Sequence, residues 1–245
     1  MPEIGLIFLL DVALVIHAAK TGRFSPWGYV IIFLPGIGGL AYFVVELLPE
    51  WLGSYKIQRA QQHVARVVNP GRRYRELADE LGVVDTIANR TALGEECLDL
   101  GKFEEARGHY QSVIERPLGD EPKYHLGRAQ AEFGLERPDA AIATLEELKR
   151  QWPDWRSPEG HLLYARALEK AGRAEEALEN YAGVGRYYPG AEPRVRQAQL
   201  LQSLGRGPEA AAIANEVVVG LKRAPNHVRK SQREWLASAL KIAQG

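Results

Sequence analysis

Residues 100–110 read LGKFEEARGHY, and this stretch decides the fold. Gly101 separates two segments of helical periodicity, Ala106 lies in the first turns of the second segment, and Tyr110 follows four residues later. The glycine and the alanine recur three times downstream, as Gly134 with Ala141, Gly172 with Ala177, and Gly205 with Ala210. The alanines are spaced by 35, 36 and 33 residues, which predicts a repeated pair of helices.

Each recurring residue type has a physical reason to stand where it does. Glycine adopts the left-handed backbone conformation that ends a helix in a tight turn. A small alanine lets two antiparallel helices cross closely, and a large side chain four residues later fills the space beside it. That large residue is Tyr110, Leu145 and Tyr181 in the first three copies. Pro153 and Pro189 lie 12 residues after their alanines and are expected to end the second helices.

Over about residues 84–225 this pattern resembles the tetratricopeptide repeat, a helix–turn–helix unit of 34 residues. The resemblance implies an α-solenoid of about four repeats, whose first helices line a concave groove for protein partners. The second copy departs from the pattern because its turn, at residues 136–139, looks two residues longer. The fourth copy lacks the aromatic residue and the closing proline.

The segments on either side of the repeats are also predicted to be helical. Residues 55–68 and 72–81 read as leading helices, and residues 227–243 read as a capping helix at the C-terminal end. We therefore expect an all-α chain with four parts. These are a hairpin at 1–50, leading helices at 51–83, repeats at 84–225 and a cap at 226–245.

The first 50 residues are far more apolar than the rest of the chain. Two apolar runs, at residues 4–19 and 27–48, predict a transmembrane helical hairpin, because a spanning helix needs about 20 apolar residues. The distribution of Lys and Arg favours both termini in the cytoplasm. We therefore expect two spans in the inner (cytoplasmic) membrane of a bacterium, with the repeats in the cytoplasm. The alternatives are a cleaved signal peptide followed by one span, or a buried hairpin in a soluble protein.

Parts of this segment resemble the two-helix anchor that precedes phospholipase D-type domains, as in cardiolipin synthases. The resemblance rests on Trp27, Pro35-Gly36, Gly39 and Tyr42-Phe43. It implies a membrane anchor and no phospholipase chemistry, because the H-x-K signature of those enzymes is absent from this sequence. Three polar residues, Asp11, His17 and Glu46, are compatible with a role in proton or substrate transfer or with contacts near the ends of the runs.

The composition excludes several classes of function. The 31 basic and 31 acidic residues give no net charge, which argues against a protein that binds nucleic acid through bulk charge. The single cysteine, Cys97, excludes a disulfide framework and is expected to be a buried packing residue. No histidine, serine or glycine motif of a known catalytic site occurs. We therefore expect no enzyme, no cofactor, no metal site and no small-molecule substrate.

The groove of the solenoid is the predicted binding surface. Counting from Leu93 places Glu95, Arg128, Arg166 and Gln199 at one groove position, and His125 and Arg196 at another. Because arginine binds carboxylates through two parallel hydrogen bonds, these residues predict an acidic peptide or a C-terminal carboxylate as the ligand. The alternative is pairing within a helix, such as Arg166 with Glu169.

Taken together, the sequence predicts a membrane-anchored adaptor or scaffold that binds protein partners through its groove. The alternative is an accessory subunit of a lipid-metabolising or envelope-assembly complex, which rests on the resemblance of the N-terminal segment to the cardiolipin synthase anchor.

Overall fold

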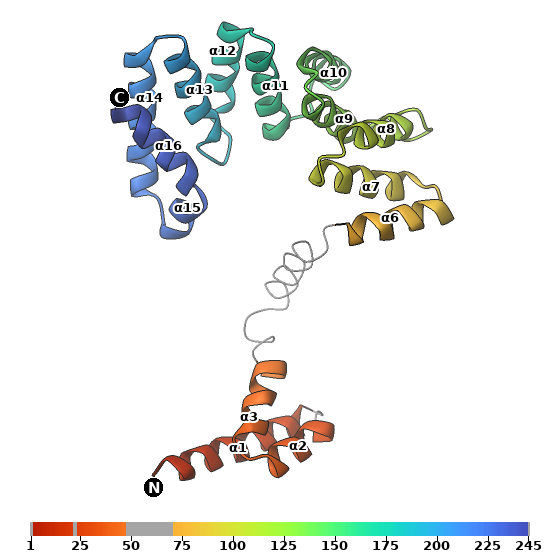
Figure 1. The fold of residues 1–245 in the computed structure, drawn as a ribbon, viewed down its shortest axis with the longest axis vertical. Coiled ribbons are helices and arrows are strands. Elements are labelled where there is room, and N and C mark those ends of the chain that lie inside the picture. Colours follow the sequence, from red (N-terminus) through yellow and green to blue (C-terminus); the bar gives the residue numbers. More distant parts are fainter. Residues whose placement is uncertain (1, 22–23, 48–70, 245) are drawn as a thin grey trace. The chain divides into compact units, whose positions relative to one another are not determined.

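The computed structural model describes residues 2–21, 24–47 and 71–244, and within these ranges every regular element is a helix. The chain divides into two compact units, residues 1–72 and 73–245 (Figure 1). The first contains α1 (Pro2–Lys20), α2 (Phe24–Phe33), α3 (Ile37–Tyr42) and the π-helix η1 (Phe43–Leu47). The second contains α6 (Arg72–Val83), α7 (Ile87–Asp99), α8 (Phe103–Ile114), α9 (Pro122–Gly134), α10 (Pro138–Gln151), α11 (Pro158–Lys170), α12 (Ala174–Val184), α13 (Glu192–Ser203), α14 (Gly207–Arg223), α15 (Asn226–Ser231) and α16 (Arg233–Gln244).

The second unit is a solenoid of four helix pairs, α7–α8, α9–α10, α11–α12 and α13–α14 (Figure 1). Each helix packs against the one before it and the one after it, so the core runs along the array. The alanines that the sequence singled out lie at the crossing within each pair and are almost completely buried: Ala106, Ala141, Ala177 and Ala210. The all-α solenoid predicted from the sequence is therefore confirmed.

The turn inside each pair depends on one residue with positive φ. Gly101, Gly172 and Gly205 have φ values of 72°, 78° and 76°, as their spacing predicts. In the second pair this position is taken by Glu136, with φ 60°, whereas Gly134 is the last residue of α9. The second turn therefore lies two residues later than the glycine pattern indicates, which moves the register of α9 relative to the other first helices.

The C-terminal end of the solenoid is covered by α16. Ala239 and Ile242 are buried in the same core cluster as Val195 and Ala198 of α13, and Trp235 packs against that cluster. The segment that we expected to be one helix at residues 227–243 is divided at Gln232 into α15 and α16. Gln232 also accepts a hydrogen bond from the backbone N–H of Ala191 (3.1 Å), which ties this segment to the start of α13.

The N-terminal unit has a small apolar core and several polar contacts between its helices. Leu14, Ala18, Ile31 and Tyr42 form the core, and the backbone N–H of Gly36 donates to the carboxylate of Asp11 (2.6 Å). His17 is hydrogen-bonded to the Tyr42 hydroxyl (3.0 Å), and Trp27 donates to Glu46 (3.0 Å). The three polar residues singled out in the sequence therefore each bind another helix or helix end of this unit.

The prediction of a two-span inner-membrane protein is wrong, because none of the helices in the described ranges is both long enough and apolar enough to cross a bilayer. The second apolar run is broken at Pro35-Gly36, where Gly36 has a φ of 82°. This break leaves α2 with 10 residues and α3 with 6. A 10-residue helix is about 15 Å long, half the roughly 30 Å of the hydrocarbon core.

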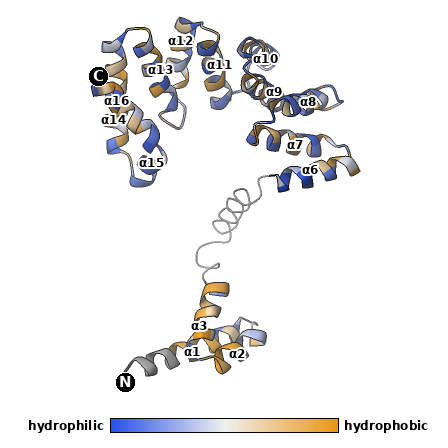
Figure 2. Ribbon diagram, in the orientation of Figure 1, coloured by the Kyte–Doolittle hydropathy of each residue, from blue (hydrophilic) through white to orange (hydrophobic). Residues whose placement is uncertain are grey.

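Hydropathy alone did not reveal this break, because the residues on both sides of it are apolar. Figure 2 shows apolar residues along α2 and α3, and several of them are exposed, including Phe33, Ile37 and Leu40. Another sequence expectation, the leading helix at residues 55–68, lies outside the described residues.

Candidate functional site

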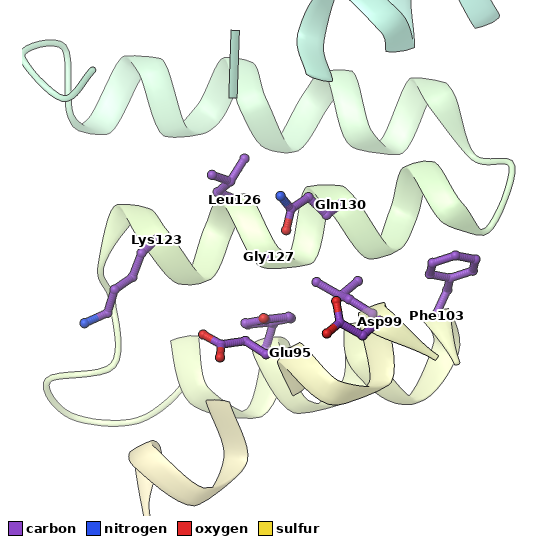
Figure 3. Close-up of a pocket in the computed structure, with 9 residues that line it drawn as sticks. Glu95, Asp99, Phe103, Lys123, Leu126, Gly127 and Gln130 are labelled. Atoms are coloured by element: carbon purple, nitrogen blue, oxygen red, sulfur yellow. The ribbon is translucent and has the colours of Figure 1, made fainter. Parts of the chain in front are cut away.

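A cavity of about 560 Å³ opens between the first two helix pairs. Its walls come from α7, from α8 and from the facing side of α9 (Figure 3). The lining residues are Glu95, Leu98, Asp99, Phe103, Tyr110, Lys123, Leu126, Gly127 and Gln130. Most of these side chains belong to α7 and α9, the first helices of their pairs, whose faces line the groove in solenoids of this kind.

The floor of the cavity is set by the packing of one aromatic ring against two glycines. Tyr110 is only 3% exposed, and its ring packs directly on Gly127. A Cβ atom at position 127 would lie only 2.3 Å from Cζ of the ring. A Cβ on Gly94 would lie 3.3 Å from Cε2 of the same ring. Burial, and then the charges of Glu95 and other acidic neighbours, raise the pKa of the Tyr110 phenol. The ring therefore stays neutral and fixed at neutral pH.

The rim of the cavity is charged unevenly. Glu95 and Asp99 are both exposed and lie on the α7 side, whereas Lys123 and Gln130 come from α9 (Figure 3). The ammonium group of Lys123 pairs with Glu121 (2.9 Å) and lies over the Tyr124 ring (4.7 Å). The rim therefore has two carboxylates on the α7 side and one ammonium group, already paired with Glu121, on the α9 side.

Of the six residues predicted to line the groove, only Glu95 lines this cavity. Counted from the positive-φ residues, the α9 residue equivalent to Glu95, Arg166 and Gln199 is Gln130, because the second turn lies at Glu136. Arg128 is two residues away from that position. The count from Leu93 placed Arg128 there because it matched Leu93 with Leu126, which lies eight residues before Gly134 as Leu93 does before Gly101, and it missed Gln130 for the same reason.

Arg128 takes part in a buried polar cluster between α8, α9 and α10. Its guanidinium donates to Gln111 (2.9 Å) and Thr144 (3.2 Å) and pairs with Glu132 (3.6 Å). The Thr144 hydroxyl donates to Glu132 (2.7 Å). Burial raises the pKa of Glu132, and this residue occupies the core position that Cys97, Leu168 and Leu201 fill in the other pairs.

Three of the remaining predicted residues, His125, Arg166 and Arg196, also have partners within the chain. His125 is buried, with Nε2 hydrogen-bonded to Asp120 (2.6 Å), and its ring lies against Trp152. The Arg166 guanidinium lies 4.9 Å from the centre of the Phe133 ring. Arg196 pairs with Glu192 (2.7 Å) and lies 5.4 Å from the Trp235 ring. Gln199 is exposed on α13.

The geometry of these helix pairs agrees with comparisons to known proteins. Tetratricopeptide-repeat family models match residues 91–154 and 158–179. The chain carries tetratricopeptide repeats. The crystal structure of a thermophilic tetratricopeptide-repeat protein from Thermus thermophilus is similar in fold, with a TM-score of 0.55 and 20% sequence identity, over 75% of this chain and 98% of that chain. No curated protein matches the sequence.

The tetratricopeptide matches begin at residue 91 and do not reach the N-terminal unit. The resemblance of that unit to the anchor of phospholipase D-type enzymes is therefore not supported. Tetratricopeptide repeats are typical of adaptors and scaffolds that bind other proteins, and the cavity is lined mainly by residues of the first helices α7 and α9.

Proposed function

We propose that this chain is an adaptor that binds a segment of a protein partner in the cavity between α7, α8 and α9. The observation that carries the proposal is the pair of exposed carboxylates, Glu95 and Asp99, on the rim of a cavity whose floor is the fixed Tyr110 ring. A lysine or arginine side chain of the partner would pair with these carboxylates. Gln130, on the opposite wall, would exchange hydrogen bonds with the partner's backbone.

The prediction of an acidic ligand bound by Arg128, Arg166 and Arg196 remains a separate hypothesis. Each of these guanidiniums already has a partner within the chain, so binding a carboxylate there requires an exchange of contacts. The alternative of an accessory subunit in a lipid-metabolising or envelope-assembly complex rested on the N-terminal resemblance, and no observation on the described residues favours it.

Affinity capture with the full-length chain tests the proposal. The wild-type chain would be compared with Glu95→Arg/Asp99→Arg and with the control Glu179→Arg, which reverses a charge on the exposed face of α12. We expect a protein that the wild type and the control retain and the double variant loses, and a basic segment of that protein that binds in isolation. Equal retention by all three chains, with unchanged circular dichroism, would refute this site.

A further inference from the structure

A second and larger cavity, of about 1090 Å³, is lined by residues of the second and third helix pairs. It opens between α10 and α12, the second helices of their pairs, and the first turns of α11 form its floor. Its lining includes four aromatic side chains, Trp155, His161, Tyr164 and Tyr187. None of the residues predicted to bind a partner lies in it, and it shares no lining residue with the first cavity.

One wall of this cavity is held in place by a chain of hydrogen bonds. The side-chain amide of Asn180 donates to the backbone carbonyl of Glu176 (2.8 Å), which turns its oxygen toward Nε2 of His161 (3.1 Å). Nε2 therefore carries the proton, and Nδ1 accepts a hydrogen bond from the Tyr187 hydroxyl. Burial lowers the pKa of His161, so the ring is neutral at pH 7 and the wall is preformed.

Tyr164 extends the aromatic lining along the same side. Its hydroxyl donates to Glu146 (2.8 Å), which fixes the ring and occupies a carboxylate oxygen of Glu146. Gly183, on α12, leaves the space in front of His161 open, since a Cβ there would already lie 3.4 Å from Cε1 of the imidazole. An apolar side chain of a ligand fits such a space without displacing a wall.

Two cations line this cavity without a carboxylate partner among the described residues, Lys149 of α10 and Arg156 of the α10–α11 connection. The guanidinium of Arg156 has only a weak hydrogen bond to the backbone carbonyl of Pro153 (3.3 Å). By contrast, the basic residues along the same helices are mostly paired, as Arg150 is with Glu147 and Arg173 is with Glu176. Lys149 and Arg156 thus line a cavity that also has apolar and aromatic walls.

We propose that the groove between α10, α11 and α12 is a second docking site, which binds an acidic segment of a protein partner through one aromatic or aliphatic anchor. The anchor would enter the space between Trp155, His161 and Tyr187. Carboxylates of the same segment would pair with Lys149 and Arg156 on either side of it. An anchor in a desolvated pocket, flanked by complementary charge, is the arrangement that concentrates binding energy in protein interfaces.

The probe is a fluorescein-labelled pool of nine-residue peptides, acidic at every position except one central phenylalanine, tryptophan or leucine. Fluorescence polarisation would be measured with the full-length chain and with two groove variants. Lys149→Glu/Arg156→Glu reverses the charge, and Gly183→Leu fills the anchor space at a helical position that favours leucine over glycine. The control is Arg186→Glu, which reverses an exposed charge just beyond α12 that does not line the groove.

We expect the wild type and the control to bind the pool within twofold of each other, and each groove variant to bind at least tenfold more weakly. Glu95→Arg should not weaken binding, which separates this site from the proposed adaptor cavity. The proposal is overturned if the pool does not bind at millimolar protein, or if all variants bind equally. It is also overturned if serine in place of the anchor has no effect, or if free phenylacetate binds as tightly as the best peptide.

Discussion

The contact between Tyr110 and Gly127 gives the sharpest test of how the first two repeats pack. In Gly127→Ala, the new Cβ would lie 2.3 Å from Cζ, 2.4 Å from Cε1 and 2.7 Å from Cε2 of the ring, whereas an ordinary contact is 3.4 Å or more. The ring would have to move by about 1 Å, but Tyr110 is only 3% exposed and its ring also packs closely against Gly94. Overpacking of this kind costs about 1–3 kcal/mol.

A matched control separates this clash from the intrinsic effect of replacing glycine in a helix. Gly108, in α8, is exposed, and a Cβ there meets nothing within 4 Å. Gly108→Ala should therefore stabilise the chain by roughly 0.5–1 kcal/mol through helix propensity alone. Since the same gain partly offsets the clash, Gly127→Ala should destabilise the chain by about 1–2 kcal/mol, and the two substitutions should have opposite signs.

The assay is urea unfolding of the full-length chain, followed by circular dichroism at 222 nm, with midpoints and slopes compared. A third background, Tyr110→Leu, removes the ring atoms that the new methyl group meets. In that background Gly127→Ala should become neutral or stabilising, which a double-mutant cycle reports as coupling between the two sites. If Gly127→Ala and Gly108→Ala are equally stable in the wild-type background, the close packing of Tyr110 on α9 is refuted.

Three further predictions concern single residues of the repeats. Glu136→Gly should raise the free energy of unfolding by about 0.5–1 kcal/mol, because glycine adopts a positive φ without strain. Gly172→Ala should lower the free energy of unfolding for the converse reason. A loss of stability in Glu136→Gly would contradict this interpretation of the turn. Burial raises the pKa of Glu132, so this carboxyl group binds a proton more tightly in the folded protein than in the unfolded chain. The stability of the wild type should therefore fall relative to that of Glu132→Gln as the pH rises from 4.5 to 7. Parallel pH profiles of the two proteins would contradict this. Burial raises the pKa of the Cys97 thiol to about 11, so the thiolate is scarce in the folded protein at pH 8. Ellman's reagent at pH 8 should therefore modify Cys97 only after unfolding. Rapid reaction of the folded chain would contradict this prediction, because it would show an accessible thiolate.

The sequence predicted the repeats well because their turns and helix crossings depend on residue types that few alternatives can replace. Gly101, Gly172 and Gly205 mark turns with positive φ, and the four alanines mark crossings without room for a larger side chain. The sequence indicated that the second turn, at residues 136–139, is longer, whereas the connection has the usual three residues and is displaced instead. Nothing in the chemistry of Glu136 indicates a left-handed conformation, and Gly134 was therefore taken as the turn residue.

That single shift explains why the site was harder to predict than the fold. A helix turns by about 100° per residue, so a displacement of two residues moves a side chain to a different face. Arg128 consequently lies in the buried cluster with Glu132, and Gln130 takes the place on the cavity wall. At the N-terminus, hydropathy predicted continuous spans because it averages over residues such as Gly36 and Asp11, whose hydrogen bond accompanies the break in the helix.

The packing of α16 onto the last repeat has a consequence for how copies of this chain meet. A solenoid whose terminal repeat is uncovered exposes an apolar surface at that end. The first repeat of another copy can stack on this surface, and repeated stacking forms a filament. Here Trp235, Ala239 and Ile242 occupy that surface. Stacking of another copy on this end would require α16 to be displaced first, so the packing of α16 opposes association through the last repeat.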